Sequence, residues 1–166
     1  MTYDHCRELD ERLRDPHWIS DRKRLIAWLD GLSNVDSCIE LGLRQAGEKE
    51  DWLVFESYLL AAHRHPSSSF TAVLCEVLSH QSDEVNNEDI VDVLADIRDP
   101  AAVGCLEATL WWQPPWDEYR QLAVKCVWAL AAIGTPDAVA VLRDAASCEA
   151  TQVRDAAVHK LNLAGS

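Results

Sequence analysis

The sequence predicts an all-α fold, an α-solenoid in which helical hairpins stack one on the next. Apolar residues recur at helical spacing through almost the whole chain, and the two-residue alternation that marks strands is absent. Related patterns also return with a period in the mid-thirties, which is typical of stacked hairpins. A single helix has too little partner surface to bury its apolar stripe, so neighbouring hairpins must cover one another. We therefore expect about four to five hairpins in a right-handed superhelical stack.

The individual helices follow from the apolar periodicity and from the turn residues between them. The clearest helix runs from about Trp116 to Ile133 and carries one broad apolar stripe. Gly134 marks its end, and Thr135 followed by Pro136 is typical of an N-cap and a first helical residue. The expected helices lie at residues 20–30, 35–46, 49–64, 67–80, 87–97, 100–111, 117–133, 136–147 and 151–163, with a weaker pattern near residues 3–14.

The repeat is clearest when segments 36 residues apart are aligned. Residues 94–100, which read Leu-Ala-Asp-Ile-Arg-Asp-Pro, match residues 130–136, which read Leu-Ala-Ala-Ile-Gly-Thr-Pro. Residues 120–124 match residues 154–158 in a similar way, and residues 60–66 carry a more degraded copy. Recurrence at this period predicts that each copy is one helical hairpin.

The segment from Tyr119 to Leu142 resembles a HEAT-like repeat. Such a repeat has an Arg-x-x-Ala helix, a turn of small residues and a second helix that opens near Pro-x-Ala-Val. In this chain these parts fall at residues 120–123, 133–135 and 136–139. The resemblance implies a fold and a binding habit, and it does not imply one particular activity.

The length of 166 residues suits one domain with a core of its own. The HEAT-like resemblance is good over roughly residues 87–163 and weak before them. Residues 1–50 therefore either continue the stack or form an N-terminal cap. We expect a single HEAT-like solenoid domain over residues 1–166.

Composition and cysteine spacing indicate the environment of the protein. With 48% apolar and 26% charged residues, the chain has the mixture of a soluble globular protein. Its start, Met1 to His5, lacks the parts of a secretory signal, and no apolar run reaches the roughly 20 residues that span a bilayer. We expect a cytoplasmic protein without membrane contact. The six cysteines lie far apart in apolar segments, which favours reduced, buried thiols over disulfides or zinc ligands.

The formal net charge of -13 argues against nucleic-acid binding, because a phosphate backbone requires clustered Lys and Arg. The acidity is local, since residues 76–118 hold eleven acids and a single base, Arg98. A basic protein partner would explain this charge. Simple solubility is the alternative explanation.

Within that stretch, one expected helix exposes a row of like charges. The apolar stripe of residues 87–97 leaves Glu88, Asp92 and Asp96 stacked at i, i+4 and i+8, with Asp89 beside them. Glu88 and Asp89 would be stabilised near the positive N-terminus of the helix, whereas Asp96 lies near its negative end. Stability alone does not explain the row, so we predict a partner-binding face, with a merely solvated face as the alternative.

Tryptophans mark the loop that follows. Trp111, Trp112 and Trp116 gather around two prolines that must break the helix, and we expect one core ring and one or two exposed rings. The other tryptophans within helical patterns are predicted to be core residues: Trp18, Trp28, Trp52 and Trp128. The predicted partner-binding residues are Glu88, Asp89, Asp92, Asp96, Trp111, Trp112, Trp116, Asp117 and Glu118.

The sequence offers no catalytic or metal-binding arrangement. His-Glu-x-x-His, Gly-x-Ser-x-Gly and glycine-rich phosphate loops are absent. His63 and His65 are two residues apart and do not share a helix face, so a metal site with Cys75 or His80 is not favoured. HEAT-like oxygenases bind iron through His-Glu pairs, but no histidine here precedes a glutamate, and HEAT-like DNA glycosylases need a basic face. We expect no enzyme activity, no cofactor and no metal.

HEAT-like repeats also occur among bacterial immunity proteins of polymorphic toxin systems. This resemblance, the small size and the acidic, tryptophan-bearing region make an immunity or antitoxin-like inhibitor of a basic toxin or effector domain the leading hypothesis. Such an inhibitor would dock its acidic helix over a cationic nuclease cleft. The main alternative is a general scaffold subunit for protein–protein interaction. A resemblance to phycobilin lyases gives a third hypothesis, which predicts binding of a linear tetrapyrrole.

Overall fold

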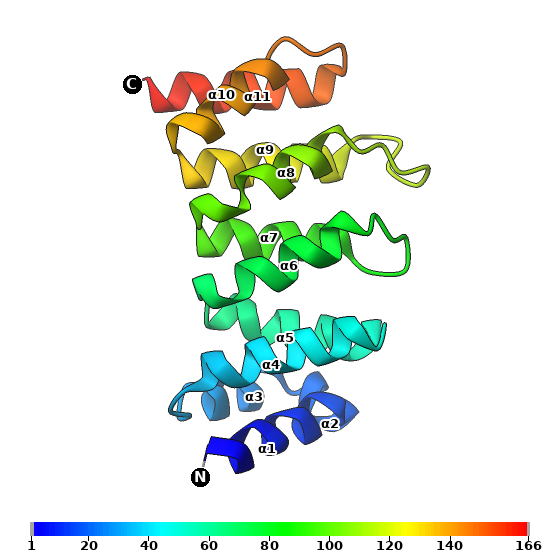
Figure 1. Ribbon diagram of the computed structural model, residues 1–166, viewed down its shortest axis with the longest axis vertical. Coiled ribbons are helices and arrows are strands. Elements are labelled where there is room, and N and C mark those ends of the chain that lie inside the picture. The colour runs from blue at the N-terminus through cyan, green and yellow to red at the C-terminus, as the bar shows by residue number, and fades with distance from the viewer. Residues whose placement is uncertain (1, 166) are drawn as a thin grey trace.

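A computed structural model describes residues 2–165 of the chain, with side chains described from residue 5 onward, and no strand occurs among them. The helices stack into an elongated column, with the N-terminus at one end and the C-terminus at the other (Figure 1). Their bounds are α1 Thr2–Arg14, α2 Pro16–Ser20, α3 Arg22–Leu29, α4 Val35–Glu48, α5 Trp52–Arg64, α6 Thr71–Ser79, α7 Asn87–Ile97, α8 Val103–Trp111, α9 Gln121–Ile133, α10 Pro136–Ala145 and α11 Thr151–Ala164, with 3-10 turns η1 Ser68–Phe70 and η2 Pro100–Ala102. The all-α prediction is confirmed for the described part of the chain.

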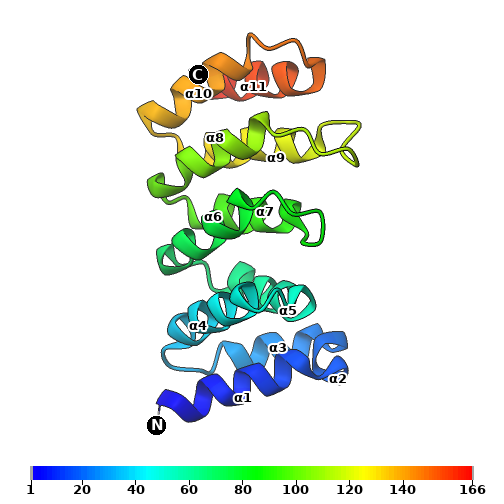
Figure 2. The same ribbon diagram turned by 45° about the vertical axis from the view of Figure 1, so that its right-hand side comes forward.

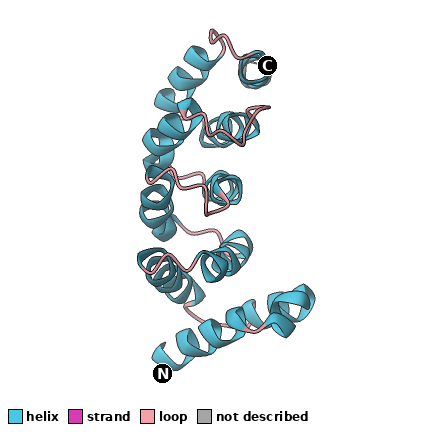
Figure 3. Cartoon of the chain, turned by 90° about the vertical axis from the view of Figure 1, so that its right-hand side faces the viewer, coloured by secondary structure: helices cyan, strands magenta, loops and turns pink. Residues whose placement is uncertain are grey.

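The column consists of helical hairpins in two layers. α4, α6, α8 and α10 form one layer, α5, α7, α9 and α11 form the other, and the two layers are seen side by side in Figure 3. Figure 2 shows the hairpins as successive levels, beginning with α1 and the α2–α3 pair. α1 packs on α4 and α5, so the first hairpin lies directly on the second. One hydrophobic cluster extends from Leu9 in α1 to Ala157 in α11, as expected for a solenoid.

The turn chemistry expected between repeats is present. Gly134 ends α9 with a φ of +67°, and the hydroxyl of Thr135 accepts the backbone N–H of Ala138. One repeat earlier, Arg98 takes the left-handed conformation at the position equivalent to Gly134, with a φ of +57°. Asp99 then accepts the N–H of Ala101. Both prolines of this motif lie in the first turn of the following element.

Several element boundaries differ from the prediction, among them the start of α5, which lies at Trp52 and not at residue 49. The expected helices 67–80 and 100–111 begin with the 3-10 turns η1 and η2, so their α-helical parts are shorter. α9 begins at Gln121 and not at residue 117, because residues 117–120 form a turn in which Arg120 is left-handed. The short α2 at residues 16–20 was not expected. It begins with a proline that follows the N-cap Asp15, and its five residues are too few for an apolar period to show.

The prediction that all cysteines are reduced is wrong for four of them. Cys6 forms a disulfide with Cys38, and Cys75 forms one with Cys105. The partners are 32 and 30 residues apart, close to one repeat, so cysteines that look isolated in the sequence lie side by side on successive helices of one layer. Disulfides persist mainly in oxidising compartments, so these two bonds do not support a cytoplasmic location. That location stays a prediction.

The two remaining cysteines are free thiols. Cys126 is buried in α9, and Cys148 is half-buried after α10. Burial raises the pKa of the Cys126 thiol, which keeps it protonated and inert at neutral pH. The expectation of reduced thiols agrees with the structure for both residues, and the expectation of burial agrees for Cys126.

The tryptophans in helices are mostly, but not all, packed on the core. Trp18, Trp28 and Trp52 are half-buried against the hydrophobic cluster, as predicted. Trp128 is 49% exposed, so its assignment to the core is wrong. The apolar stripe of α9 is already filled by smaller side chains, and Trp128 lies on the open side of the helix with Lys160 above its ring. No helix within residues 2–165 combines the length and apolarity that a membrane crossing requires.

Candidate interaction surface

The acidic row on α7 is matched by a cation from the next repeat. Lys125 of α9 places its Nζ 2.6 Å from Asp92 Oδ2 and 3.2 Å from Glu88 Oε2. Burial opposes the charge of Lys125, but the hydrogen bond and charge of Asp92, aided by Glu88, outweigh it and raise the lysine pKa. Two of the predicted partner-binding acids are therefore already paired within the protein.

The other two acids of α7 also have internal contacts. Asp96 Oδ2 lies 2.8 Å from Nδ1 of His63, which projects from α5. Asp89 accepts a hydrogen bond from Asn86 Nδ2, and its backbone N–H donates to Asn86 Oδ1 at the N-cap. Pairing within the stack therefore explains part of this acidic row. The bases that pair with it are distant from α7 in sequence. Lys125 and His63 lie one repeat away, 33 residues from their partners.

The tryptophan-bearing loop between α8 and α9 divides into core and exposed rings. Trp112 is half-buried and packs against the core, whereas Trp111 is 44% and Trp116 is 45% exposed. The rings of Trp112 and Trp116 meet edge to face, with centroids 6.3 Å apart. The expectation of one core ring and one or two exposed rings agrees with this arrangement.

Trp116 also joins two successive loops. Its Nε1 donates to Asp83 Oδ1 at 2.8 Å, and Asp83 belongs to the loop between α6 and α7. A similar bond links Trp52 Nε1 at the start of α5 to Glu84 Oε2 at 3.2 Å. Asp83, Glu84 and Trp52 were not predicted as site residues. The spacings of 33 and 32 residues, close to one repeat, are the sequence signal that could have found them.

Asp117 is not available to a partner, which corrects its assignment to the binding site. Its side chain is 5% exposed and accepts the backbone N–H groups of Gln121 at 2.7 Å and Leu122 at 3.1 Å. Asp117 therefore satisfies the first turn of α9, where its charge also suits the helix N-terminus. Glu118, the next residue, is exposed and stays a candidate.

Three of the loops within the hairpins lie along one edge of the column, which we call the loop edge: residues 49–51, 80–86 and 112–120 (right-hand side of Figure 1). Among the described residues, it exposes four acids, Glu50, Asp83, Glu84 and Glu118, and one lysine, Lys49. Its exposed aromatic side chains are Trp116 and Tyr119. A hollow of about 220 Å³ lies on it, lined by Asp83, Val85, Asn86, Asn87, Glu88 and Trp116. Glu88 and Trp116, which the sequence assigned to one site, are therefore brought together.

A comparison with protein families identifies the repeats. The family model of HEAT repeats matches residues 71–162, which is more than half of the chain. The chain belongs to the HEAT repeat family. The matched region runs from α6 to α11 and includes both longer loops of the loop edge. No curated protein is similar to this sequence.

HEAT repeats are generally protein-interaction modules, which is consistent with a binding scaffold. The hairpins of this chain fit that use, because they hold the α6–α7 and α8–α9 loops next to each other on one rigid edge. The surface therefore combines clustered acids with a fixed, exposed indole ring. Such a surface can bind an oppositely charged protein.

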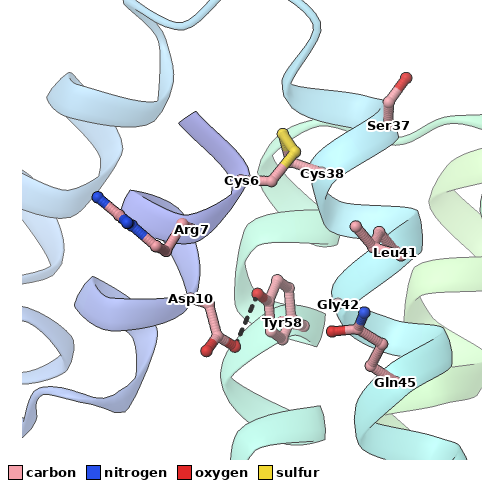
Figure 4. Close-up of a pocket in the computed structure, with 9 residues that line it drawn as sticks. All are labelled: Cys6, Arg7, Asp10, Ser37, Cys38, Leu41, Gly42, Gln45 and Tyr58. Carbon is pink, nitrogen blue, oxygen red and sulfur yellow. Dashed lines mark hydrogen bonds between the residues drawn. A yellow bond between two sulfur atoms is a disulfide. The ribbon is translucent and has the colours of Figure 1, made fainter. Parts of the chain in front are cut away.

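A second hollow, of about 360 Å³, lies outside the matched HEAT repeats, between α1 and α4 (Figure 4). The Cys6–Cys38 disulfide forms part of its wall, and Tyr58 of α5 donates its hydroxyl to Asp10 Oδ1 at 3.1 Å. Burial raises the pKa of Tyr58, so its hydroxyl stays protonated. The Tyr58 ring lies directly against Gly42, where a Cβ would be 2.0 Å from the ring. This hollow is therefore shaped by packing between the first two hairpins.

The histidines considered as metal ligands are held in other contacts. His63 binds Asp96, His65 Nε2 lies 3.3 Å from Asp30, and Cys75 is in a disulfide. Within residues that the structure describes, no three His, Cys, Asp or Glu side chains gather closely enough to hold a metal ion. The local polarity near residue 65 serves contacts between hairpins.

Proposed function

We propose that this HEAT-repeat protein is a non-catalytic binding module, and more specifically an immunity or antitoxin-like inhibitor of a basic toxin or effector domain. The observation that carries the proposal is the position of Trp116. Its ring is exposed, its Nε1 is held by Asp83 of the preceding repeat, and Glu88 lines the same hollow. A rigid tryptophan surrounded by clustered acids is the kind of residue that dominates binding energy at protein interfaces.

The charge of the loop edge supports a basic partner. Lys125 offsets part of the charge of α7, whereas the loop-edge acids Glu50 and Glu118 are exposed and form no ion pair among the described residues. One-sign charge on a rigid edge speeds association with a cationic surface and disfavours acidic competitors. The proposed contact surface therefore moves from the middle of α7 toward the loop edge, and Trp111, Trp116, Glu88 and Glu118 stay within it.

A general scaffold subunit is the second candidate, and one observation favours it. The pairs of Asp92 with Lys125 and of Asp96 with His63 give the acids of α7 a use inside the stack. Because acids of α7 already pair with bases on neighbouring helices, they do not require a basic partner. The two candidates differ in the charge of the partner, which is a measurable property.

The test is co-expression with the product of the adjacent reading frame, followed by calorimetric titration of the purified pair. We expect complex formation that weakens with salt, and Trp116→Ala to weaken binding by about tenfold or more, as for interface hot spots. Glu118→Lys should weaken it further at low salt. Trp128→Ala is the matched control, because Trp128 is equally exposed but lies in the middle of α9.

Trp112 packs against the core and Asp92 binds Lys125, so substitutions there would perturb the fold as well as the surface. If Trp116→Ala binds as tightly as the parent, as the control Trp128→Ala is expected to do, the loop edge is not the binding site. If the captured partner is acidic or neutral, the inhibitor proposal is wrong and the scaffold is favoured.

A further inference from the structure

We propose that the hollow between the α6–α7 and α8–α9 loops is a receptor for an arginine side chain of the partner. This inference rests on the proposed function and specifies its central contact. The hollow is about 220 Å³ and is lined by an indole, two carboxylates and two asparagine side chains. Three kinds of lining residue can attract a guanidinium: the aromatic Trp116, the acids Asp83 and Glu88, and Asn87, whose amide oxygen has no partner among the described residues.

The ring of Trp116 is fixed from two sides. Asp83 accepts its Nε1–H at 2.8 Å, and the Trp112 ring packs against it edge to face at 6.3 Å. The ring is nevertheless 45% exposed. A guanidinium stacks on tryptophan more favourably than on any other aromatic side chain, and a ring that is already oriented loses little freedom on binding.

Asn87 supplies a polar atom that lacks a partner. The residue is 1% exposed, and its Nδ2 donates to the carbonyl oxygens of Ser82 at 2.8 Å and Val85 at 3.2 Å. These two bonds fix the orientation of the amide. Its Oδ1 is buried and has no hydrogen-bond partner among the described residues. A buried acceptor without a donor is costly, so a donor brought by a ligand would be favourable.

The two carboxylates contribute charge in different ways. Glu88 shares its charge with Lys125, which lies 3.2 Å from Oε2, whereas the carboxylate of Asp83 is bonded to a neutral indole. The N-terminus of α7 is positive and by itself repels a cation, but Glu88 and Asp89 lie in its first turn and offset that field.

These acceptors favour arginine over lysine. A guanidinium is planar, so it can stack on Trp116, and its five N–H donors can reach several acceptors at once. A lysine ammonium has three donors on one atom and does not stack. The hollow should therefore discriminate between the two cations, and it should reject citrulline, which has the shape of arginine without the charge.

The experiment is a titration of the ¹⁵N-labelled protein with N-acetyl-arginine amide at low salt, followed by NMR. The Trp116 indole N–H and the side-chain amide of Asn87 should shift together and saturate. The lysine analogue should bind several-fold more weakly, and citrulline amide should produce no saturating shift. Citrulline shifts equal to those of arginine would overturn the proposal.

Substitutions test whether arginine binds in the hollow or elsewhere on the surface. Trp116→Leu and Asp83→Asn should each lower arginine affinity by about fivefold to tenfold, and Asp83→Asn keeps an oxygen that can accept the indole N–H. Trp128→Leu is the matched control, since Trp128 is 49% exposed but does not line the hollow, and it should change the affinity less than about twofold. Equal effects of the two tryptophan variants would contradict the site.

The outcome is distinguishable from that of the proposed function. If the partner complex forms through the loop edge but free arginine does not bind the hollow, only the arginine receptor is wrong. If arginine saturates the hollow but no basic partner is captured, the receptor stands and the inhibitor proposal fails. A thermal melt of each variant shows whether it remains folded.

Discussion

The hairpins α1–α5 and the hairpins α6–α11 follow the same stacking rule with different side chains. The HEAT match covers only the second group. In that group, Lys125 binds Asp92 and Trp116 binds Asp83, each across 33 residues. The first group uses nearly the same spacing, with Cys6 bonded to Cys38 at 32 residues and Arg64 bonded to Asp30 at 34. The family motif is therefore lost toward the N-terminus, but the spacing at which side chains pair between successive hairpins is kept.

The first hairpin differs in the side chains that cover its apolar surface. In α1 to α3, the guanidinium of Arg12 lies 3.8 Å from the ring of Trp18 and 4.4 Å from that of Trp28, and Arg24 lies over Trp18 at 4.2 Å. Rings and long charged side chains can cover apolar surface while facing water, which small aliphatic residues do less well. An N-terminal cap over residues 1–50, one of the two expected alternatives, would use such side chains.

The largest expected effect tests this comparison through the two disulfides. Each closes a loop of about 30 residues, and removal of such a cross-link costs about 3 to 4 kcal/mol in the chain-entropy model. Replacing Cys75 and Cys105 by alanine should lower the free energy of unfolding of the HEAT repeats as a unit. Replacing Cys6 and Cys38 should instead release the first hairpin, because its described residues pack on α4 and α5 of the second hairpin and this disulfide joins the two.

Urea denaturation and hydrogen exchange measure the two cases. After loss of the Cys6–Cys38 bond, exchange should rise in α1 to α3 while α7 and α9 stay protected. Unfolding of the whole chain in one step would show that the first hairpin is not a separate cooperative unit. As a control on the pairing, the denatured, unreduced parent should titrate as two thiols, those of Cys126 and Cys148.

A smaller effect is expected at two glycines, one from each region. Gly42 in α4 lies against the Tyr58 ring, where a Cβ would be 2.0 Å away, and Tyr58 is buried. Gly42→Ala should therefore destabilise the protein by about 2 kcal/mol, since overpacking outweighs the gain in helix propensity. Gly104→Ala in α8, where a Cβ meets nothing within 4 Å, should stabilise it by up to about 1 kcal/mol.

Thermal and urea unfolding of the two variants measure the change in the free energy of unfolding, which should fall for Gly42→Ala and rise for Gly104→Ala. The paired design matters because each substitution adds the same methyl group to a helix. If Gly42→Ala is neutral, the close contact between α4 and α5 is relieved by a small movement of Tyr58. The first two hairpins would then be more loosely packed than the HEAT repeats.

The sequence predicts the repeats better than it predicts the site. Helical periodicity and the motif from Gly134 to Pro136 depend on local interactions, so the helices and most of their ends could be placed. The partners of Asp92, Trp116 and Cys75 are about one repeat away and depend on which helices stack. The same spacing was visible in the sequence. This spacing indicates hairpins, but it pairs side chains across them only when the stacking of the helices is known.

Asp117 shows a different limit. Its neighbours Trp116 and Glu118 are exposed, and an acid beside an exposed tryptophan indicates a surface site. The left-handed turn at Arg120, which delays the start of α9 and directs Asp117 toward the N–H groups of Gln121 and Leu122, has no glycine to mark it. A cap of this kind can be recognised only when the start of the helix is known to within about one residue.

The smallest expected effect compares one ion pair from each region. Lys125→Met should destabilise the protein by less than about 1 kcal/mol at neutral pH, because surface pairs are weak and this one is partly screened by water. The folded state raises the lysine pKa above its ordinary value of 10.5, so the stabilisation is complete below that pH. It is lost as pH rises through the folded-state pKa. The difference in the free energy of unfolding between parent and variant, measured by urea denaturation, should be constant from about pH 7 to 9 and shrink near pH 11.

Arg64→Met, which removes the Asp30 pair of the first group, should show no such decline, because a guanidinium stays charged throughout this range. A constant difference for Lys125→Met up to pH 11 would mean that Lys125 acts through the packing of its aliphatic chain on α7 and not through charge.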